Sequence, residues 1–294
     1  MNLKTITKSL FALSAVVALA ACSNQTTSNS TTSNSNSSNT ALKTVKVASV
    51  GSDAEIWRHI AETDQAKKAG LKIEVEELNG GVPLNQAVAE GSVDANAFQS
   101  IGYLQGFNAS NSSKLTPIGT TYIEPMGLYS KKVKSLNDLP NGAKIAIPDN
   151  PYNTTRALRL LETAGLIKLS ADFKEGTGTP SDIVENKKNF EFLLIDDTTS
   201  IRVLDDADLI AIGNTIALEG GLNVLKDALF YEKADASTIT SINVIVVKSG
   251  NESNDDYKKL VDLYHDADVQ KFISDKFQGT KVEVKKPISE VWGK

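Results

Sequence analysis

Apolar side chains recur along the chain after residue 43 in two different periods, which predicts alternating strands and helices. Short apolar runs predict strands at 45–50, 71–76, 143–148, 190–195, 209–212 and 242–247. Apolar residues three and four positions apart predict helices at 52–69, 83–89, 153–164, 257–264 and 269–277. Such alternation is typical of mainly parallel α/β sheets, and its appearance in two blocks predicts two sheets and therefore two lobes.

Specific residues mark some of the helix ends. Ser52 is followed three residues later by Glu55, which is the spacing of a capping box, so we expect Ser52 to cap the first helix. Gly70 and Gly165 each follow a helical pattern, where a glycine commonly ends the helix in a left-handed conformation.

The first 43 residues show neither period. Lys4 and Lys8 precede an apolar run at 10–21 that is too short to cross a bilayer, so we expect residues 1–21 to be a secretory signal peptide. The run ends in Leu-Ala-Ala-Cys22, which resembles a bacterial lipobox and implies cleavage before Cys22 and acylation of that cysteine. Residues 23–40 are all Ser, Thr, Asn or Gln, so we expect 22–43 to form a lipidated, disordered tether.

Composition favours a binding protein over an enzyme. The chain has 31 Lys and Arg against 36 Asp and Glu, and this net charge of −5 argues against a nucleic-acid partner. The single cysteine excludes an internal disulfide and a cysteine metal site. No nucleophile elbow, P-loop or zinc-protease motif occurs, and only His59 and His265 could supply imidazole chemistry. We therefore expect no catalytic residues, no metal and no cofactor.

Arg156 is the most informative charged residue. The apolar face of the 153–164 helix leaves Arg156 in the predicted first turn, where a positive charge opposes the helix dipole. An anionic ligand would satisfy both the guanidinium and the free N–H groups of that turn. Pairing with a surface acid such as Asp149 is the alternative.

Several polar residues stand where a ligand of a parallel α/β sheet is expected, beyond the carboxyl ends of the strands. They are Ser49, Ser52, Asn153 and Asn214, with Asn243 inside an apolar strand. Phe98 and Tyr103 could form an aromatic wall beside them. With one arginine, these groups suit a zwitterionic small molecule that has an apolar side chain. A polar network in the core would explain the asparagines equally well.

Seven segments resemble the NlpA family, the methionine-binding lipoproteins of bacterial ABC importers. They are 52–56 (SDAEI), 94–99 (DANAFQ), 122–130 (YIEPMGLYS), 146–151 (AIPDNP), 153–158 (NTTRAL), 182–186 (DIVEN) and 227–230 (DALF). The resemblance covers essentially the whole chain after the tether, and the lipobox also fits this family.

The resemblance implies a type 2 periplasmic-binding-protein fold, in which two α/β lobes joined by two crossing strands close over an amino acid. The crossings are expected near 129–133 and 237–243. Lobe 1 would then comprise 44–131 plus 241–294, and lobe 2 would comprise 132–240.

The resemblance also implies roles for individual residues. Arg156 would bind the ligand carboxylate, and the zwitterionic end would be hydrogen-bonded by Asn153, Asn214 and Asn243. Phe98 and Tyr103 would shape the side-chain pocket.

The chain departs from the family pattern beside that pocket. Ser100 replaces a histidine that usually follows the Phe-Gln pair, and Gly80-Gly81 replaces a common aromatic residue. Both changes remove bulk, which predicts a widened pocket and leaves open another amino acid or a short methionine-containing peptide as the ligand.

The expected protein is a monomeric, lipid-anchored solute-binding protein on the extracytoplasmic face of the membrane, at a Gram-positive cell surface. It would deliver an amino acid, methionine first, to an ABC permease and its ATPase. A surface adhesin on the same scaffold is one rival interpretation, and an enzyme on this fold is another.

Overall fold

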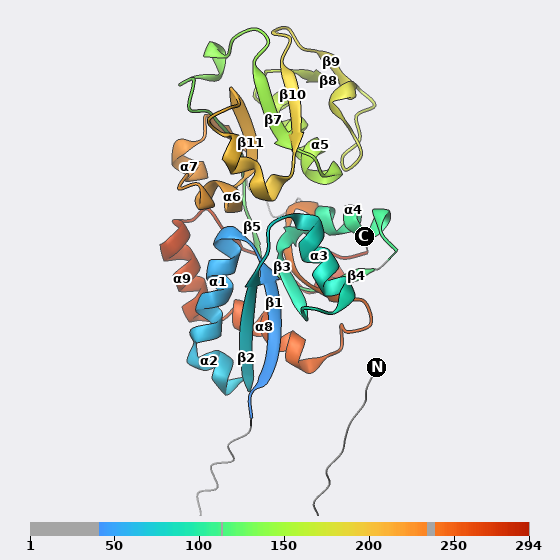
Figure 1. The fold of residues 1–294 in the computed structure, drawn as a ribbon, viewed down its shortest axis with the longest axis vertical. Coiled ribbons are helices and arrows are strands. Elements are labelled where there is room, and N and C mark those ends of the chain that lie inside the picture. The colour runs from blue at the N-terminus through green and yellow to red at the C-terminus, as the bar shows by residue number, and fades with distance from the viewer. Residues whose placement is uncertain (1–40, 113, 234–238, 294) are drawn as a thin grey trace, which may run out of the picture. The chain divides into compact units, whose positions relative to one another are not determined.

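The computed structural model describes residues 41–112, 114–233 and 239–293 (Figure 1). The expected signal peptide, Cys22 and the tether as far as residue 40 lie outside the described residues. Within the described ranges, no helix has the length and apolar character needed to cross a membrane.

The first lobe is built on a five-stranded sheet with the strand order β2-β1-β3-β13-β4. Its strands are β1 (Lys43–Ser49), β2 (Leu71–Glu77), β3 (Ala95–Ser100), β4 (Leu115–Thr120) and β13 (Asn243–Lys248). The pairs β1–β2 and β1–β3 are parallel, whereas β13 is antiparallel to both of its neighbours. Only β13 therefore runs against the other four strands.

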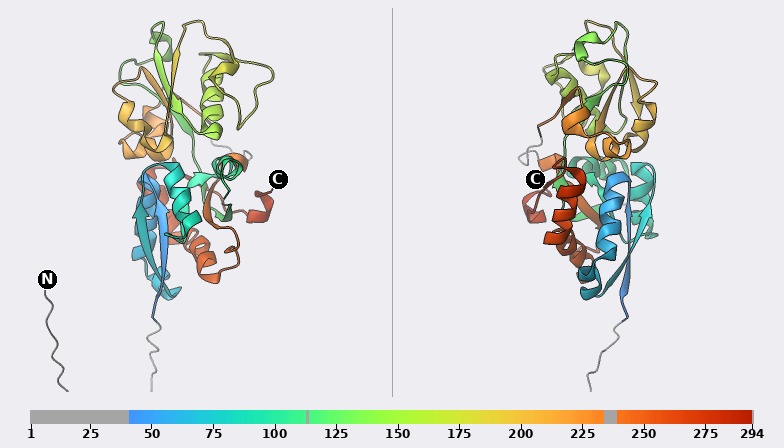
Figure 2. Two further views of the ribbon diagram at one scale, coloured as in Figure 1. Left: turned by 45° about the vertical axis from the view of Figure 1, so that its right-hand side comes forward. Right: turned by 90° about the vertical axis from the view of Figure 1, so that its left-hand side faces the viewer.

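Helices cover both faces of this sheet (Figures 1 and 2). They are α1 (Gly51–Glu62), α2 (Asp64–Lys68), α3 (Gly81–Glu90), α4 (Ile101–Ser110), α8 (Asp255–Tyr264) and α9 (Ala267–Phe277). One apolar core contains Trp57 of α1 with Leu260 of α8 and Phe277 of α9. The other contains Leu84 of α3 and Leu104 of α4. The helices near the C-terminus thus complete the first lobe.

The second lobe has its own five-stranded sheet, with the order β10-β7-β11-β6-β12. Its strands are β6 (Met126–Tyr129), β7 (Lys144–Pro148), β10 (Glu191–Ile195), β11 (Leu209–Gly213) and β12 (Phe230–Tyr231). Its helices are α5 (Pro151–Thr163), α6 (Asn214–Glu219) and α7 (Val224–Asp227), and β8 (Lys168–Leu169) pairs with β9 (Ile183–Glu185). Here only β6 is reversed. The predicted α/β fold with two mainly parallel sheets is confirmed.

The first crossing between the lobes differs from the expected one. The short strand β5 (Tyr122–Ile123) pairs with β14 (Val282–Glu283) in the first lobe, and β6 already belongs to the second sheet. The chain therefore crosses at Glu124 and Pro125 rather than near 129–133, because the four residues of β6 are all buried within the second lobe. The return crossing lies between β12 and β13, and residues 237–238 of its expected range are outside the described residues.

Three predicted helix starts are wrong. Helix α3 begins at Gly81 rather than at Pro83. Helix α1 begins at Gly51 after Val50, so Ser52 lies inside the helix and does not cap it. Helix α5 begins at Pro151, because the side chain of Asn150 accepts a hydrogen bond from the backbone N–H of Asn153 at 2.9 Å. Arg156 consequently lies in the second turn of α5, where the argument from the helix dipole no longer applies.

Candidate ligand-binding site

A cavity of about 70 Å³ lies between the two lobes. Both lobes and the first crossing line it, through Val50, Phe98, Gln99, Ser100, Tyr103, Glu124, Met126, Pro148, Asn153, Arg156, Asp197, Thr198, Gly213, Thr215, Ile216 and Asn243. Ser100, Pro148 and Gly213 end three strands, so the cavity lies at the carboxyl edges of both sheets. Six of the seven predicted ligand-binding residues meet here, and the seventh, Asn214, does not line the cavity.

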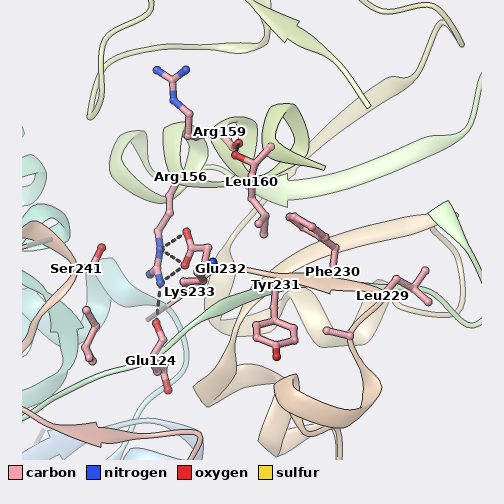
Figure 3. Close-up of a pocket in the computed structure, with 13 residues that line it drawn as sticks. Glu124, Arg156, Arg159, Leu160, Leu229, Phe230, Tyr231, Glu232, Lys233 and Ser241 are labelled. Atoms are coloured by element: carbon pink, nitrogen blue, oxygen red, sulfur yellow. Dashed lines mark hydrogen bonds and ion pairs between the residues drawn. The ribbon is translucent and has the colours of Figure 1, made fainter. Parts of the chain in front are cut away.

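Arg156 is held by an acid that the sequence did not point to. Its Nε donates to both carboxylate oxygens of Glu232 at 2.9 Å, and its Nη2 donates to Glu232 at 2.5 Å and to the Glu124 carbonyl at 2.8 Å (Figure 3). The side chain is only 14% exposed. Burial alone would lower the pKa of Arg156, but the adjacent Glu232 carboxylate raises it, so the guanidinium is charged. The partner is thus Glu232 and not Asp149.

The guanidinium retains hydrogen-bonding capacity for a ligand. An arginine side chain has five N–H donors, and Glu232 and Glu124 occupy those of Nε and Nη2. Among the described residues, no acceptor is bonded to Nη1. Because Arg156 lines the cavity, its fixed and charged guanidinium can present this nitrogen to a carboxylate.

The same arginine borders a second, wider groove of about 720 Å³ (Figure 3). This groove lies along α5 and β12, and its lining includes Arg159, Leu160, Phe230 and Tyr231. Arg156 thus separates the interlobe cavity from this groove.

Asn153 and Asp197 contribute a polar wall from the second lobe. Asp197 begins the 3₁₀ segment Asp197–Val203, which follows β10. Its Oδ2 accepts hydrogen bonds from the side-chain amides of Asn153 at 2.6 Å and Asn150 at 2.8 Å. Burial raises the pKa of Asp197 to about 6; the nearby carboxylates of Asp196 and Asp149 raise it too, and the two amides oppose this.

The first lobe contributes aromatic rings and small polar groups. Phe98 and Tyr103 meet edge to face, with ring centroids 5.6 Å apart. Ser100 caps α4 by accepting a hydrogen bond from the backbone N–H of Tyr103 at 3.3 Å. Asn243 is the register partner of Ser100 on the neighbouring strand, and it is 8% exposed. These residues form the part of the cavity lining that comes from the first lobe.

The pocket is not widened at Gly81. A Cβ atom on Gly81 would lie 2.7 Å from Cζ of Tyr103 and 3.3 Å from Cε2 of Phe98, so these rings fill the space that the glycine leaves. The backbone N–H of Gly80 donates to Oγ1 of Thr198 at 2.8 Å, which links the two lobes at the rim. The loss of bulk at 80–81 is therefore compensated by Tyr103.

Asn214 belongs to a buried ionic network beside the cavity. Its amide donates to Glu124 at 3.0 Å and to Thr280 at 3.1 Å. Glu124 also accepts a hydrogen bond from the backbone N–H of Thr215 at 3.1 Å, so its carboxylate satisfies the N-terminus of α6. The amide N–H groups of Asn214 thus hold the crossing segment, whereas its Oδ1 is buried without a donor from the described residues.

Lys281 is the cation of this network, and its side chain is fully buried. Its Nζ donates to Asp53 at 2.9 Å and to Glu124 at 3.1 Å, and it lies 4.0 Å from the ring centroid of Tyr122. The Tyr122 hydroxyl donates to Asp53 at 2.7 Å. Burial raises the pKa of Asp53, Lys281 opposes this, and Glu124 adds to it. The network joins the first lobe to the crossing segment and to α6.

Sequence reasoning missed Asp197, Glu232 and Lys281. Asp197 comes two residues after a predicted strand, so the rule that located Asn153 would also have found it. Glu232 and Lys281 carry no local signal, because their partners are far away in the chain. Among the described residues, no group of three or more His, Cys, Asp or Glu side chains is arranged to hold a metal ion.

Comparisons with known proteins agree with this architecture. The NlpA lipoprotein family matches residues 45–285. The D-methionine-binding lipoprotein MetQ of Salmonella typhimurium is 36% identical over 239 residues, which cover 80% of this chain and 85% of that protein.

Solved structures of related proteins have a similar fold. A nutrient-binding protein from Burkholderia cenocepacia, solved bound to methionine, is 39% identical with a TM-score of 0.76, and the match covers 81% of this chain and 99% of that one. The substrate-binding protein of a methionine transporter from Streptococcus pneumoniae is 35% identical with a TM-score of 0.75, covering 82% and 95%. Because the family match spans most of the chain and the relatives are similar over nearly their whole length, the chain belongs to the NlpA lipoprotein family.

Proposed function

We propose that this chain is a solute-binding lipoprotein that captures an amino acid between its two lobes, and that methionine is the favoured ligand. The observation that carries the proposal is the charged guanidinium of Arg156, which borders the interlobe cavity with Nη1 directed at no acceptor among the described residues. A ligand carboxylate would complete its hydrogen bonding. Phe98 and Tyr103 supply an apolar surface for the ligand side chain.

Relatives support methionine as the first ligand to test. The Salmonella typhimurium relative is named as a D-methionine-binding protein, and the Burkholderia cenocepacia structure contains methionine. Ser100 stands where the resemblance implies a histidine. Because serine is smaller, the ligand could also be another amino acid or a short methionine-containing peptide.

The chain would act in import and would catalyse no reaction. Ligand binding would stabilise the closed arrangement of the lobes, which Gly80 and Thr198 already link, and the closed form would be recognised by an ABC permease that an ATPase drives. Acylation at Cys22 would anchor the protein on the extracytoplasmic face of the membrane. If so, Cys22→Ser moves the protein from the membrane fraction to the soluble fraction.

A thermal-shift screen tests the binding proposal. The ligands are L-methionine, D-methionine, the other amino acids and glycyl-methionine. A ligand at about 100 times its Kd adds roughly 2.7 kcal/mol to the free energy of unfolding, which raises Tm by about 5–11 °C in a protein of this size. No shift with any of these compounds contradicts the proposal.

A further inference from the structure

Asp197 and Asn153, which both line the cavity, each have a side-chain oxygen that receives no donor from the described residues. Oδ2 of Asp197 accepts both side-chain amides described above, whereas Oδ1 of Asp197 receives no donor from the described residues. Oδ1 of Asn153 is also buried without a hydrogen-bond partner in the described part of the chain. Both residues line the cavity, and the Asn153 amide binds Asp197 directly. Two cavity-lining residues that bind each other therefore each have one oxygen without a donor.

An ammonium group has the complementary chemistry, since it has three donors, no acceptor and a positive charge. We propose that Asp197, together with Oδ1 of Asn153, receives the ammonium group of the ligand. This inference rests on the proposed function and deepens it: the cleft would select solutes that have a free, protonated amine. The two charged ends of the zwitterion would then bind different residues: Arg156 would bind the carboxylate and Asp197 would bind the ammonium group.

The charges around Asp197 support this assignment. Within the described ranges, no Lys, Arg or His side chain forms an ion pair with Asp197, which is half-buried, although carboxylates removed from water normally have a cationic partner. Its charged neighbours, Asp196 and Asp149, are also acids, and Asp196 already accepts hydrogen bonds from Thr198. An incoming ammonium group would supply the missing positive charge.

Asp197 also stabilises the start of α5, because it accepts hydrogen bonds from the side-chain amides of Asn150 and Asn153. The experiment must therefore separate this structural role from ligand binding. Asp197→Asn suits this purpose, because asparagine keeps an oxygen that can accept from these amides but loses the charge. Asp197→Ser is a second variant. Asp149→Asn is the matched control, because Asp149 is an exposed neighbour that does not line the cavity.

Isothermal titration of the purified full chain with two probes tests the inference. The probes are L-methionine and 4-(methylsulfanyl)butanoate, which keeps the carboxylate and the side chain but lacks the amine. We expect Asp197→Asn to weaken L-methionine binding by about 30-fold or more and to change binding of the amine-free analogue by less than about 3-fold. Asp149→Asn should leave both affinities unchanged.

Other outcomes overturn the inference. An equal loss of affinity for both probes in both Asp197 variants would mean that Asp197 only braces α5. Unchanged L-methionine binding would mean that it does not contact the ligand. If the unmodified chain binds neither probe, the proposed function itself fails, and this result differs from either failure of the Asp197 assignment.

Discussion

Replacing Lys281 with methionine removes the cation from the buried network between the lobes. The Lys281 side chain is 0% exposed, and its Nζ donates to Asp53 at 2.9 Å, to Glu124 at 3.1 Å and to Thr215 at 2.6 Å. Methionine preserves most of the apolar stem but donates no hydrogen bond. Two carboxylates would remain buried without their counter-charge.

The structure sets the size of the effect. Removing one partner of a buried ion pair costs about 3–5 kcal/mol, because the remaining charge stays desolvated. Since two carboxylates share Lys281, we expect the upper part of this range. A typical protein is stable by about 5–15 kcal/mol, so the loss is a large fraction of the total. A loss of about 4–5 kcal/mol corresponds to a fall in Tm of about 8–20 °C.

Urea unfolding followed by circular dichroism measures this loss. Lys285→Met is the matched control, because Lys285 is exposed, and we expect a change of no more than about 0.5 kcal/mol. Adding Asp53→Asn to Lys281→Met should recover part of the stability by removing one of the stranded charges. If Lys281→Met is no less stable than the control, the network does not hold the lobes and the reasoning is refuted.

Two further predictions concern the cavity. The pKa of Asp197 is about 6 in the folded chain against 3.8 in the reference state, so the ligand-free protein should lose about 3 kcal/mol of stability from this group as pH rises from about 4 to above 6. Unfolding at pH 4.5 and 7.5 checks this, because the gain in stability from Asp197→Asn should be about 2 kcal/mol larger at pH 7.5 than at pH 4.5. An equal effect at the two pH values would contradict it. Gly81→Ala should cost about 1–3 kcal/mol and weaken ligand binding by displacing Tyr103. Gly106→Ala, with no neighbour within 4 Å, is its control, and equal behaviour of the two in unfolding and titration would contradict the packing argument.

Local periodicity predicted part of the fold: six of the ten strands in the two five-stranded sheets were expected, whereas β3, β4, β6, β12 and helix α4 were not. The alternation at 71–76 became β2, and the patterns at 257–264 and 269–277 became α8 and α9, because apolar spacing fixes which face each segment buries. The first crossing was misplaced because the apolar residues of β6 carry no signal of the sheet to which they belong.

The sequence predicted some residues that line the cavity but not the residues that orient them. Arg156 and Asn153 were found because polar groups at the ends of strands meet at one sheet edge. The partners that orient them were not found, since Glu232 lies 76 residues from Arg156 and Asp197 lies 44 residues from Asn153. Nothing in the sequence indicated that the Asn214 amide donates to Glu124, because an asparagine that binds a ligand and one that binds a buried carboxylate look alike in sequence.

The central claim is that Arg156 binds the carboxylate of an amino acid between the lobes. Its most direct test is calorimetric titration of L-methionine into the unmodified chain, Glu232→Gln, and the double variant Arg156→Ala with Glu232→Gln, which leaves no carboxylate stranded. We predict binding of one methionine per chain that persists in Glu232→Gln and weakens by about 2–5 kcal/mol in the double variant. Equal affinity in the double variant and in Glu232→Gln would contradict the claim.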